Sequence, residues 1–156
     1  MRVLGLVVGD ARSVPASHRD LVECPPVAAL TTVTATGYPQ TSPVWCDFDG
    51  TFVRVNTMQG FAKERNMRRN PHVVLLCYDP SLPLRYLEIR GTVVSISETG
   101  AVEHLDLLAS KYAGRRVRYF GGVIPAEFGR TEVPVLCLIR PDHVVAMDAT
   151  EPGGER

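Results

Sequence analysis

The chain has 156 residues, of which 45% are hydrophobic and 22% charged, a composition typical of a globular protein. At roughly 150 residues per domain the length favours one domain, which can bury a core without disulfides or metals. Lysine and arginine together number 17, as do aspartate and glutamate, so the formal net charge is zero. This balance argues against a nucleic-acid-binding protein that works by neutralising phosphates.

The first expected elements form an N-terminal extension over residues 1–26 and a β-hairpin region after it. A short helix over 20–23 is expected to stop at the Pro25-Pro26 pair. Residues 27–36 are rich in Thr, Val and Ala and predict a strand, and Gly37-Tyr38-Pro39 predicts a turn. Residues 41–48 and 51–57 each alternate apolar and polar side chains. The Asp49-Gly50 pair between them predicts a hairpin.

The second half of the chain predicts two helices and three further strands. We expect a helix over 61–69 ended by Asn70-Pro71, strands over 72–78 and 85–97, a helix over 98–112, a loop over 113–132, a strand over 133–147 interrupted by Pro141, and a flexible tail over 149–156. Gly91 predicts a bulge or barrel corner within its strand. The helix over 98–112 is expected to bury Val102, Leu105, Leu108 and Ala109.

These elements together predict a mainly β protein, a closed or split β-barrel of about six mostly antiparallel strands with two or three short helices. Cys46, Cys77 and Cys137 lie in apolar runs and are expected to be buried free thiols of a reducing compartment. The Cys and His residues show no metal-ligand spacing, so no metal site is predicted. No apolar run has the length of a membrane span or secretory signal, so we expect a cytoplasmic protein with no membrane partner.

A candidate phosphate site lies where the helix over 61–69 follows a strand ending in Asn56-Thr57. The first turn of a helix has unpaired N–H groups and partial positive charge, which attract anions. Lys63 and Asn66 are three residues apart and share one face near that end, and Asn56 and Thr57 offer further polar donors. The alternative is a solvated charged face with Met67 turned to the core, which spacing alone favours.

A second candidate is Ser42-Pro43-Val44-Trp45. Pro43 lacks an N–H, so its strand is expected at a sheet edge or at a local irregularity. Backbone groups freed beside Ser42 could bond a planar heterocycle that Trp45 borders. The alternative, which we favour from these residues alone, is a packed tryptophan beside a simple bulge.

Several motifs of common enzyme classes are missing from the sequence. The chain has no Gly-rich nucleotide-binding motif, no hydrolase nucleophile motif and no evident pair of catalytic carboxylates. An enzyme of this sequence is therefore expected to let a bound cofactor perform the chemistry.

Six segments carry a family resemblance over about residues 27–148. They are Leu30-Thr31-Thr32 leading to Gly37-Tyr38-Pro39, Ser42-Pro43-Val44-Trp45, Ala62-Lys63-x-Arg65-Asn66-Met67-Arg68-Arg69-Asn70-Pro71, Arg85-Tyr86-Leu87-Glu88-Ile89-Arg90-Gly91, Lys111-Tyr112-x-Gly114, and the strand near Val135 to Met147. In this order they resemble the split-barrel flavin and deazaflavin oxidoreductases related to pyridoxamine 5′-phosphate oxidase. The branch they resemble most is the actinobacterial enzymes that use the deazaflavin coenzyme F420.

The resemblance reverses both preferences above and implies a split β-barrel cofactor-binding domain over 27–148. It implies a homodimer with two cofactor sites at the interface. The residues implied to bind the cofactor phosphate are Lys63, Asn66, Asn56 and Thr57, and those implied to line its ring system are Ser42, Pro43, Val44 and Trp45. Phe61 departs from the pattern, because some relatives place a polar or basic phosphate contact there.

The implied activity is hydride transfer between coenzyme F420 and an unsaturated small-molecule acceptor. No catalytic residue is assigned, and solvent or Tyr112 is the candidate proton donor. The anionic tail of F420 needs a basic groove, for which Arg68, Arg69 and Arg115 to Arg118 are candidates. The alternatives are an FMN-dependent oxidase or reductase of the same fold, or a non-catalytic flavin-binding or storage protein.

Overall fold

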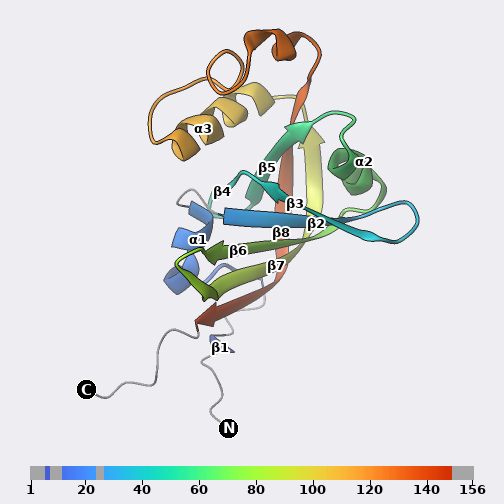
Figure 1. The fold of residues 1–156 in the computed structure, drawn as a ribbon. Helices are drawn as coiled ribbons and strands as arrows, with labels where there is room; N and C mark the ends of the chain where they lie inside the picture. Colours follow the sequence, from blue (N-terminus) through green and yellow to red (C-terminus); the bar gives the residue numbers. More distant parts are fainter. Residues whose placement is uncertain (1–5, 8–11, 24–26, 149–156) are drawn as a thin grey trace.

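A computed structural model describes residues 6–7, 12–23 and 27–148. The fold is one curled antiparallel sheet with the strand order β3-β2-β6-β7-β8-β5-β4, and the short strand β1 pairs with β8 (Figure 1). The edge strands β3 and β4 are consecutive in the chain and are separated by Trp45 alone. The sheet therefore curls until its two edges approach, which confirms the predicted split β-barrel.

The bounds of the elements follow most of the predicted pattern. The strands are β1 (Leu6–Val7), β2 (Val27–Val33), β3 (Pro39–Val44), β4 (Cys46–Phe48), β5 (Val53–Met58), β6 (His72–Asp79), β7 (Leu82–Ser97) and β8 (Pro134–Asp148). The helices are α1 (Asp20–Glu23), α2 (Ala62–Arg69) and α3 (Ala101–Ala113), with 3-10 turns η1 (Ala16–His18) and η2 (Ala126–Arg130). Within the described segments, no helix is long and apolar enough to cross a membrane.

The core fills the inside of the curled sheet. Alternate residues of β5 to β8 are fully buried there, including Val55, Leu75, Ile89 and Ile139. The cysteines Cys46, Cys77 and Cys137 are free and buried as predicted, and they pack as small apolar groups. The short helix α1 contributes Leu21 and Val22 to the same core. Cys24, the Pro25-Pro26 pair and the tail over 149–156 lie outside the described residues.

The predicted hairpin and the predicted bulge are both confirmed, and each has an identifiable physical cause. β4 and β5 form the hairpin expected around Asp49-Gly50, and the Asp49 carboxylate accepts the N–H groups of Thr51 and Phe52 at 2.8 and 2.7 Å. Gly50 has φ 97°, which a side chain would disfavour. In the pairing of β7 with β8, the register shifts between Arg90 and Gly91, so Gly91 is the predicted bulge.

Three predictions were wrong in part. The strand expected over 41–48 is two strands, because Trp45 interrupts it where the chain leaves β2 to pair with β5. In α3, which begins at Ala101 instead of 98, Val102 is 47% exposed and His104 is buried. The loop over 113–132 contains η2, which residue patterning did not indicate.

Candidate functional site

A pocket of about 470 Å³ lies where the end of β5, the start of α2, the helix α3 and the segment after it meet. Figure 1 shows α3 and that segment above one end of the sheet. Its volume falls within the range of roughly 300–1,000 Å³ in which small-molecule ligands bind. The lining residues are Pro43, Val44, Trp45, Asn56, Thr57, Met58, Phe61, Lys63, Leu105, Tyr119, Ile124, Pro125, Phe128 and Glu132.

Six of the eight predicted cofactor-binding residues line this one pocket. They come from three separate places in the chain and are Pro43, Val44, Trp45, Asn56, Thr57 and Lys63. The other two, Ser42 and Asn66, are not in its wall. Ser42 lies within β3 opposite Leu30 of β2. The fold thus brings most of the predicted phosphate and ring residues together, while their roles stay predictions.

The turn between β5 and α2 determines how Lys63 is presented. Gly60 has φ 83°, and its N–H donates to Oε2 of the buried Glu64 at 3.1 Å. Glu64 also forms an ion pair with Arg68 one turn further along α2. Phe61 precedes the helix and provides no side-chain cap, so the N–H groups of the first turn are left for other acceptors.

Lys63 is the cation of this helix end that lines the pocket, whereas Arg65 of the same turn donates to the Gly60 carbonyl oxygen. Its side chain is half-buried in the pocket wall, and burial lowers the pKa of its ammonium group. No described carboxylate counteracts that effect. A half-buried ammonium group beside an open helix N-terminus attracts an anion, which is the arrangement that a phosphate group needs.

Asn66 occupies a different place, underneath α2. Its amide nitrogen donates to Thr32 Oγ1 at 3.0 Å and to Gln40 Oε1 at 2.9 Å. These bonds hold α2 against β2 and β3, and the residue is only 6% exposed. The observed contacts of Asn66 are therefore structural, and its implied bond to a phosphate stays a prediction.

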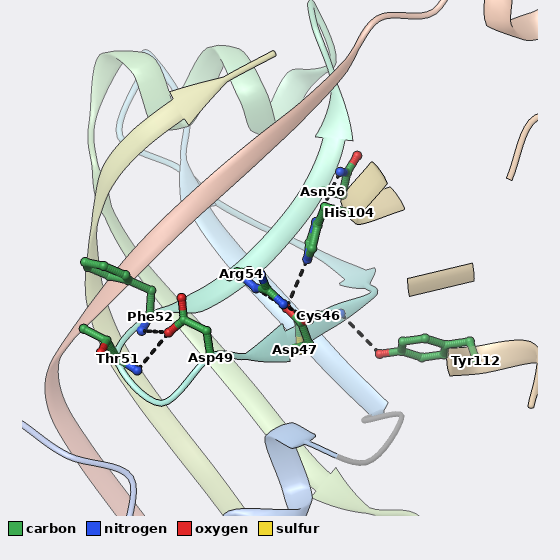
Figure 2. Close-up of polar contacts among 9 residues, drawn as sticks. All are labelled: Cys46, Asp47, Asp49, Thr51, Phe52, Arg54, Asn56, His104 and Tyr112. Atoms are coloured by element: carbon green, nitrogen blue, oxygen red, sulfur yellow. Dashed lines mark hydrogen bonds and ion pairs between the residues drawn. The ribbon is translucent and has the colours of Figure 1, made fainter. Parts of the chain in front are cut away.

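Trp45 forms a flat aromatic wall at the break between β3 and β4. Its ring stacks on Tyr112 with centroids 5.0 Å apart and planes 19° apart, and meets Tyr119 edge-on at 5.9 Å. Tyr112 is held by the Cys46 N–H, which donates to the phenol oxygen at 3.2 Å (Figure 2). Trp45 is thus both packed and pocket-lining. Burial raises the pKa of Tyr112, which makes it a weaker acid than a free tyrosine.

A buried polar network beside the pocket was missed by sequence reasoning. Nε2 of His104 lies 3.0 Å from Oδ1 of Asp47, and Arg54 forms a two-pronged ion pair with the same carboxylate (Figure 2). Nδ2 of Asn56 donates to Ala101 O at 2.8 Å and lies 3.3 Å from Nδ1 of His104. Burial acts to raise the pKa of Asp47, but His104 and Arg54 outweigh it and lower that pKa to about 2.

Two signals in the sequence point to this network. Asp47 and Arg54 are opposite charges on either side of the predicted hairpin and are in fact cross-strand partners. His104 is three residues after Ala101 and four before Leu108, which are both fully buried, so it lies on the inner face of α3. Local spacing does not show that these two groups meet.

The basic segments proposed for an anionic tail do not line this pocket. Arg68 borders a separate hollow with Met67 and Pro71, and Arg116 and Arg118 border another beside Asp106 on a different face of α3 from Leu105. Among the described residues, Lys63 and Glu132 are the only charged side chains in the pocket wall. A basic groove continuous with the pocket is therefore not seen in the single chain.

Comparisons with known proteins agree with this fold. The family model described as pyridoxamine 5′-phosphate oxidase matches residues 14–134. A solved structure named F420 reductase is 29% identical, with 84% of this chain and 98% of that chain covered and a TM-score of 0.71. No curated protein matches the sequence.

Two mycobacterial structures share the fold at lower identity. A conserved hypothetical protein from Mycobacterium tuberculosis is 20% identical, with 94% of this chain and 96% of that chain covered and a TM-score of 0.65. An FAD and heme binding protein from Mycobacterium smegmatis is 15% identical, with 94% and 77% covered and a TM-score of 0.62. Because the family model spans most of the sequence and the sheet has the expected curled topology, the chain belongs to the pyridoxamine 5′-phosphate oxidase family.

Proposed function

We propose that the protein is an oxidoreductase that uses the deazaflavin coenzyme F420 to reduce an unsaturated small molecule. The observation that carries this proposal is the pocket that contains both Lys63, at the open start of α2, and the aromatic wall of Trp45. The family supports a flavin-type cofactor, and the solved structure named F420 reductase supports the deazaflavin.

The residues of the pocket fit such a cofactor. Lys63 and the N–H groups of the first turn of α2 bind the phosphate, and Pro43, Val44 and Trp45 place the ring system. Ile124 and Phe128 provide apolar surface that excludes water from the ring. The bound deazaflavin supplies the hydride, so the protein itself needs only to position the two reactants.

FMN is the second candidate cofactor, and one observation favours it. Lys63 is the only cation in the described pocket wall, which suffices for one phosphate group, whereas the long anionic tail of F420 needs further positive charge. The Lys63 site itself does not separate the two cofactors, because both carry a phosphate on the ring side chain.

Fluorescence of Trp45, the only tryptophan, tests the proposal directly. The protein is titrated with F420 and, separately, with FMN, and quenching is followed to saturation. We expect F420 to quench at much lower concentration than FMN, and reduced F420 to be reoxidised on addition of a quinone acceptor. Preference for FMN supports the second candidate. Tight binding without turnover of any acceptor indicates a non-catalytic flavin-binding protein. If neither F420 nor FMN quenches the fluorescence, both candidate cofactors are contradicted.

We further propose that the functional unit is a homodimer. Phe61 and Phe128 line the pocket and are 47% and 44% exposed, so the single chain leaves apolar side chains at its mouth open to water. A second copy that covers these side chains would complete the wall. It would also remove their apolar surface from water, which stabilises the association by about 25 cal/mol per Å².

A further inference from the structure

Three elements meet through buried polar groups next to the pocket. Asp47 belongs to β4, Asn56 to β5 and His104 to α3. The side chains of His104 and Asp47 are only 3% and 4% exposed. The contacts form a chain from Asp47 Oδ1 to His104 Nε2 at 3.0 Å and from His104 Nδ1 to Asn56 Nδ2 at 3.3 Å (Figure 2). Asn56 Nδ2 also donates to Ala101 O at 2.8 Å.

The chemistry of these groups determines which atoms carry hydrogen. The carbonyl of Ala101 only accepts, so the Asn56 atom beside it is the amide nitrogen. That nitrogen has only hydrogens to offer His104, so Nδ1 of His104 is the unprotonated acceptor. Nε2 of His104 then carries the proton and donates to the Asp47 carboxylate, which Arg54 holds from the other side.

The result is that both hydrogens of the Asn56 amide are committed to α3. The carboxamide oxygen, Oδ1, is buried and has no hydrogen-bond partner in the described structure. Asn56 also lines the pocket that carries Lys63. An unpaired buried acceptor is unfavourable, so a ligand group that donates a hydrogen bond to it gains affinity, whereas a phosphate oxygen does not.

We propose that Asp47 and His104 are positioning residues that orient Asn56 so that it accepts a hydrogen bond from the ring system of the cofactor and does not bind the phosphate. This proposal rests on the proposed flavin-type cofactor. It differs from the phosphate role that the family resemblance implies for Asn56, and it adds two residues, Asp47 and His104, that act through Asn56 without touching the ligand.

The first test needs no ligand. The ¹⁵N spectrum of the imidazole is recorded for the wild type and for Asp47→Asn. We expect His104 to be neutral with its proton on Nε2 in the wild type, and to lose this single form in the variant. A proton on Nδ1 of the wild-type His104 would overturn the proposal, whether or not either cofactor binds.

The second test separates recognition of the ring from recognition of the phosphate. Riboflavin, which lacks the phosphate, and FMN are titrated against the wild type, Asn56→Ala and Lys63→Ala, with Trp45 quenching as the signal. We expect Asn56→Ala to weaken both ligands by the same factor, about 5- to 30-fold for one lost hydrogen bond. Lys63→Ala should weaken FMN alone. A loss in Asn56→Ala that is confined to FMN would overturn the proposal.

The third test asks whether His104 acts through Asn56. FMN affinity is measured for His104→Phe, for Asn56→Ala and for the double variant. We expect His104→Phe to weaken FMN binding as a single substitution but to have no further effect when Asn56→Ala is also present. If the two substitutions weaken binding independently, so that their factors multiply, the proposal is overturned. His104→Gln keeps an N–H for Asp47 and should bind better than His104→Phe. His72→Gln, at an exposed histidine, is the control.

The outcomes distinguish this proposal from the proposed function. If the wild type binds none of F420, FMN and riboflavin, the proposed function fails and so does the role of Asn56 in ring recognition, while the imidazole spectrum still decides whether Asp47 and His104 orient Asn56. If His104→Phe does not fold, His104→Gln and the spectrum provide the comparison. Thermal unfolding of every variant shows which losses of affinity are losses of folded protein.

Discussion

Lys63 shows how much one residue depends on the element that carries it. Its ammonium group is half-buried at the first turn of α2, and burial lowers its pKa because water no longer fully solvates the charge. An anion bound there would stabilise the charged form of Lys63, which burial disfavours. Arg69, on the same helix, is exposed and does not line the pocket, so it carries the same charge in a different setting.

We predict that Lys63→Ala weakens FMN and F420 binding about 10- to 100-fold, as expected for loss of a charge-assisted hydrogen bond. Folding should be unaffected, because no ion pair of Lys63 with a described residue is broken. Trp45 quenching provides the dissociation constants and thermal unfolding provides the stability. Arg69→Ala is the matched control for FMN, which lacks the anionic tail for which Arg69 is a candidate contact. Equal affinities in the wild type and Lys63→Ala would contradict a phosphate site at Lys63.

Asp47 predicts a specific pH dependence of stability. Its pKa is lowered from 3.8 to about 2 in the folded state, so the unfolded chain binds the proton more readily between these values. The stabilisation is complete above the unfolded pKa and is lost as the pH falls toward 2. For this nearly buried carboxylate it amounts to about 2 kcal/mol.

Urea unfolding at pH 6 and at pH 2.5 measures this contribution. We expect the free energy of unfolding of the wild type to fall more steeply between the two values than that of Asp47→Asn. Glu98→Gln, at an exposed position, serves as control and should follow the wild type. Equal slopes for wild type and Asp47→Asn would show that the His104 and Arg54 contacts do not stabilise the carboxylate.

At the scale of elements, the pairing of the long strands β7 and β8 is irregular at Gly91. The register shifts there, Pro141 is the partner of Gly91, and Pro141 itself has no N–H to donate. A side chain at Gly91 would place its Cβ 2.6 Å from Ile139 Cγ2 and 2.7 Å from the Arg140 carbonyl oxygen. The close approach of the two backbones therefore requires glycine.

Gly91→Ala should lower the free energy of unfolding by about 1–3 kcal/mol, because the backbone of β8 must move to admit the methyl group. Val94→Ala changes an exposed residue of the same strand and should change stability by less than about 0.5 kcal/mol. Both values come from urea unfolding. An unchanged stability in Gly91→Ala would mean that the bulge accommodates a side chain by local adjustment.

α2 illustrates which parts of an element could be predicted. Its bounds follow from local signals, since a glycine turn precedes it and Asn70-Pro71 ends it. The prediction that Lys63 and Asn66 share one face was less successful. Lys63 reaches the pocket, while Asn66 turns under the helix to Thr32 and Gln40, because α2 packs against β2 and β3. Spacing along a helix does not tell which neighbour that face meets.

At the scale of the whole molecule, the exposed Phe61 and Phe128 at the pocket mouth bear on the oligomeric state. We expect sedimentation to yield twice the monomer mass of 17.1 kDa, because a second copy would cover these side chains. Phe128→Glu should shift the protein toward monomer and weaken FMN binding together. A monomeric wild type that binds FMN tightly would contradict a shared site.

The curled sheet as a whole could be predicted from local sequence patterns. The alternating strands, the Asp49-Gly50 hairpin and Gly91 each act within a few residues, so their signals survive in the sequence. The break at Trp45 left no such signal in the sequence, because it arises where the chain changes its pairing partner from β2 to β5. Pairing between distant strands is decided by the fold and not by local alternation.

The candidate phosphate and ring residues were predicted from short segments of the chain together with the family resemblance that those segments carry. The contact between His104 and Asp47 is different, since 57 positions separate the two residues, and 48 separate His104 from Asn56. Such contacts exist only once α3 packs on the β4–β5 hairpin. The sequence of a segment determines its residue types and its local backbone conformation. The direction of each buried hydrogen bond depends instead on packing between elements, and that packing orients Asn56 in the pocket.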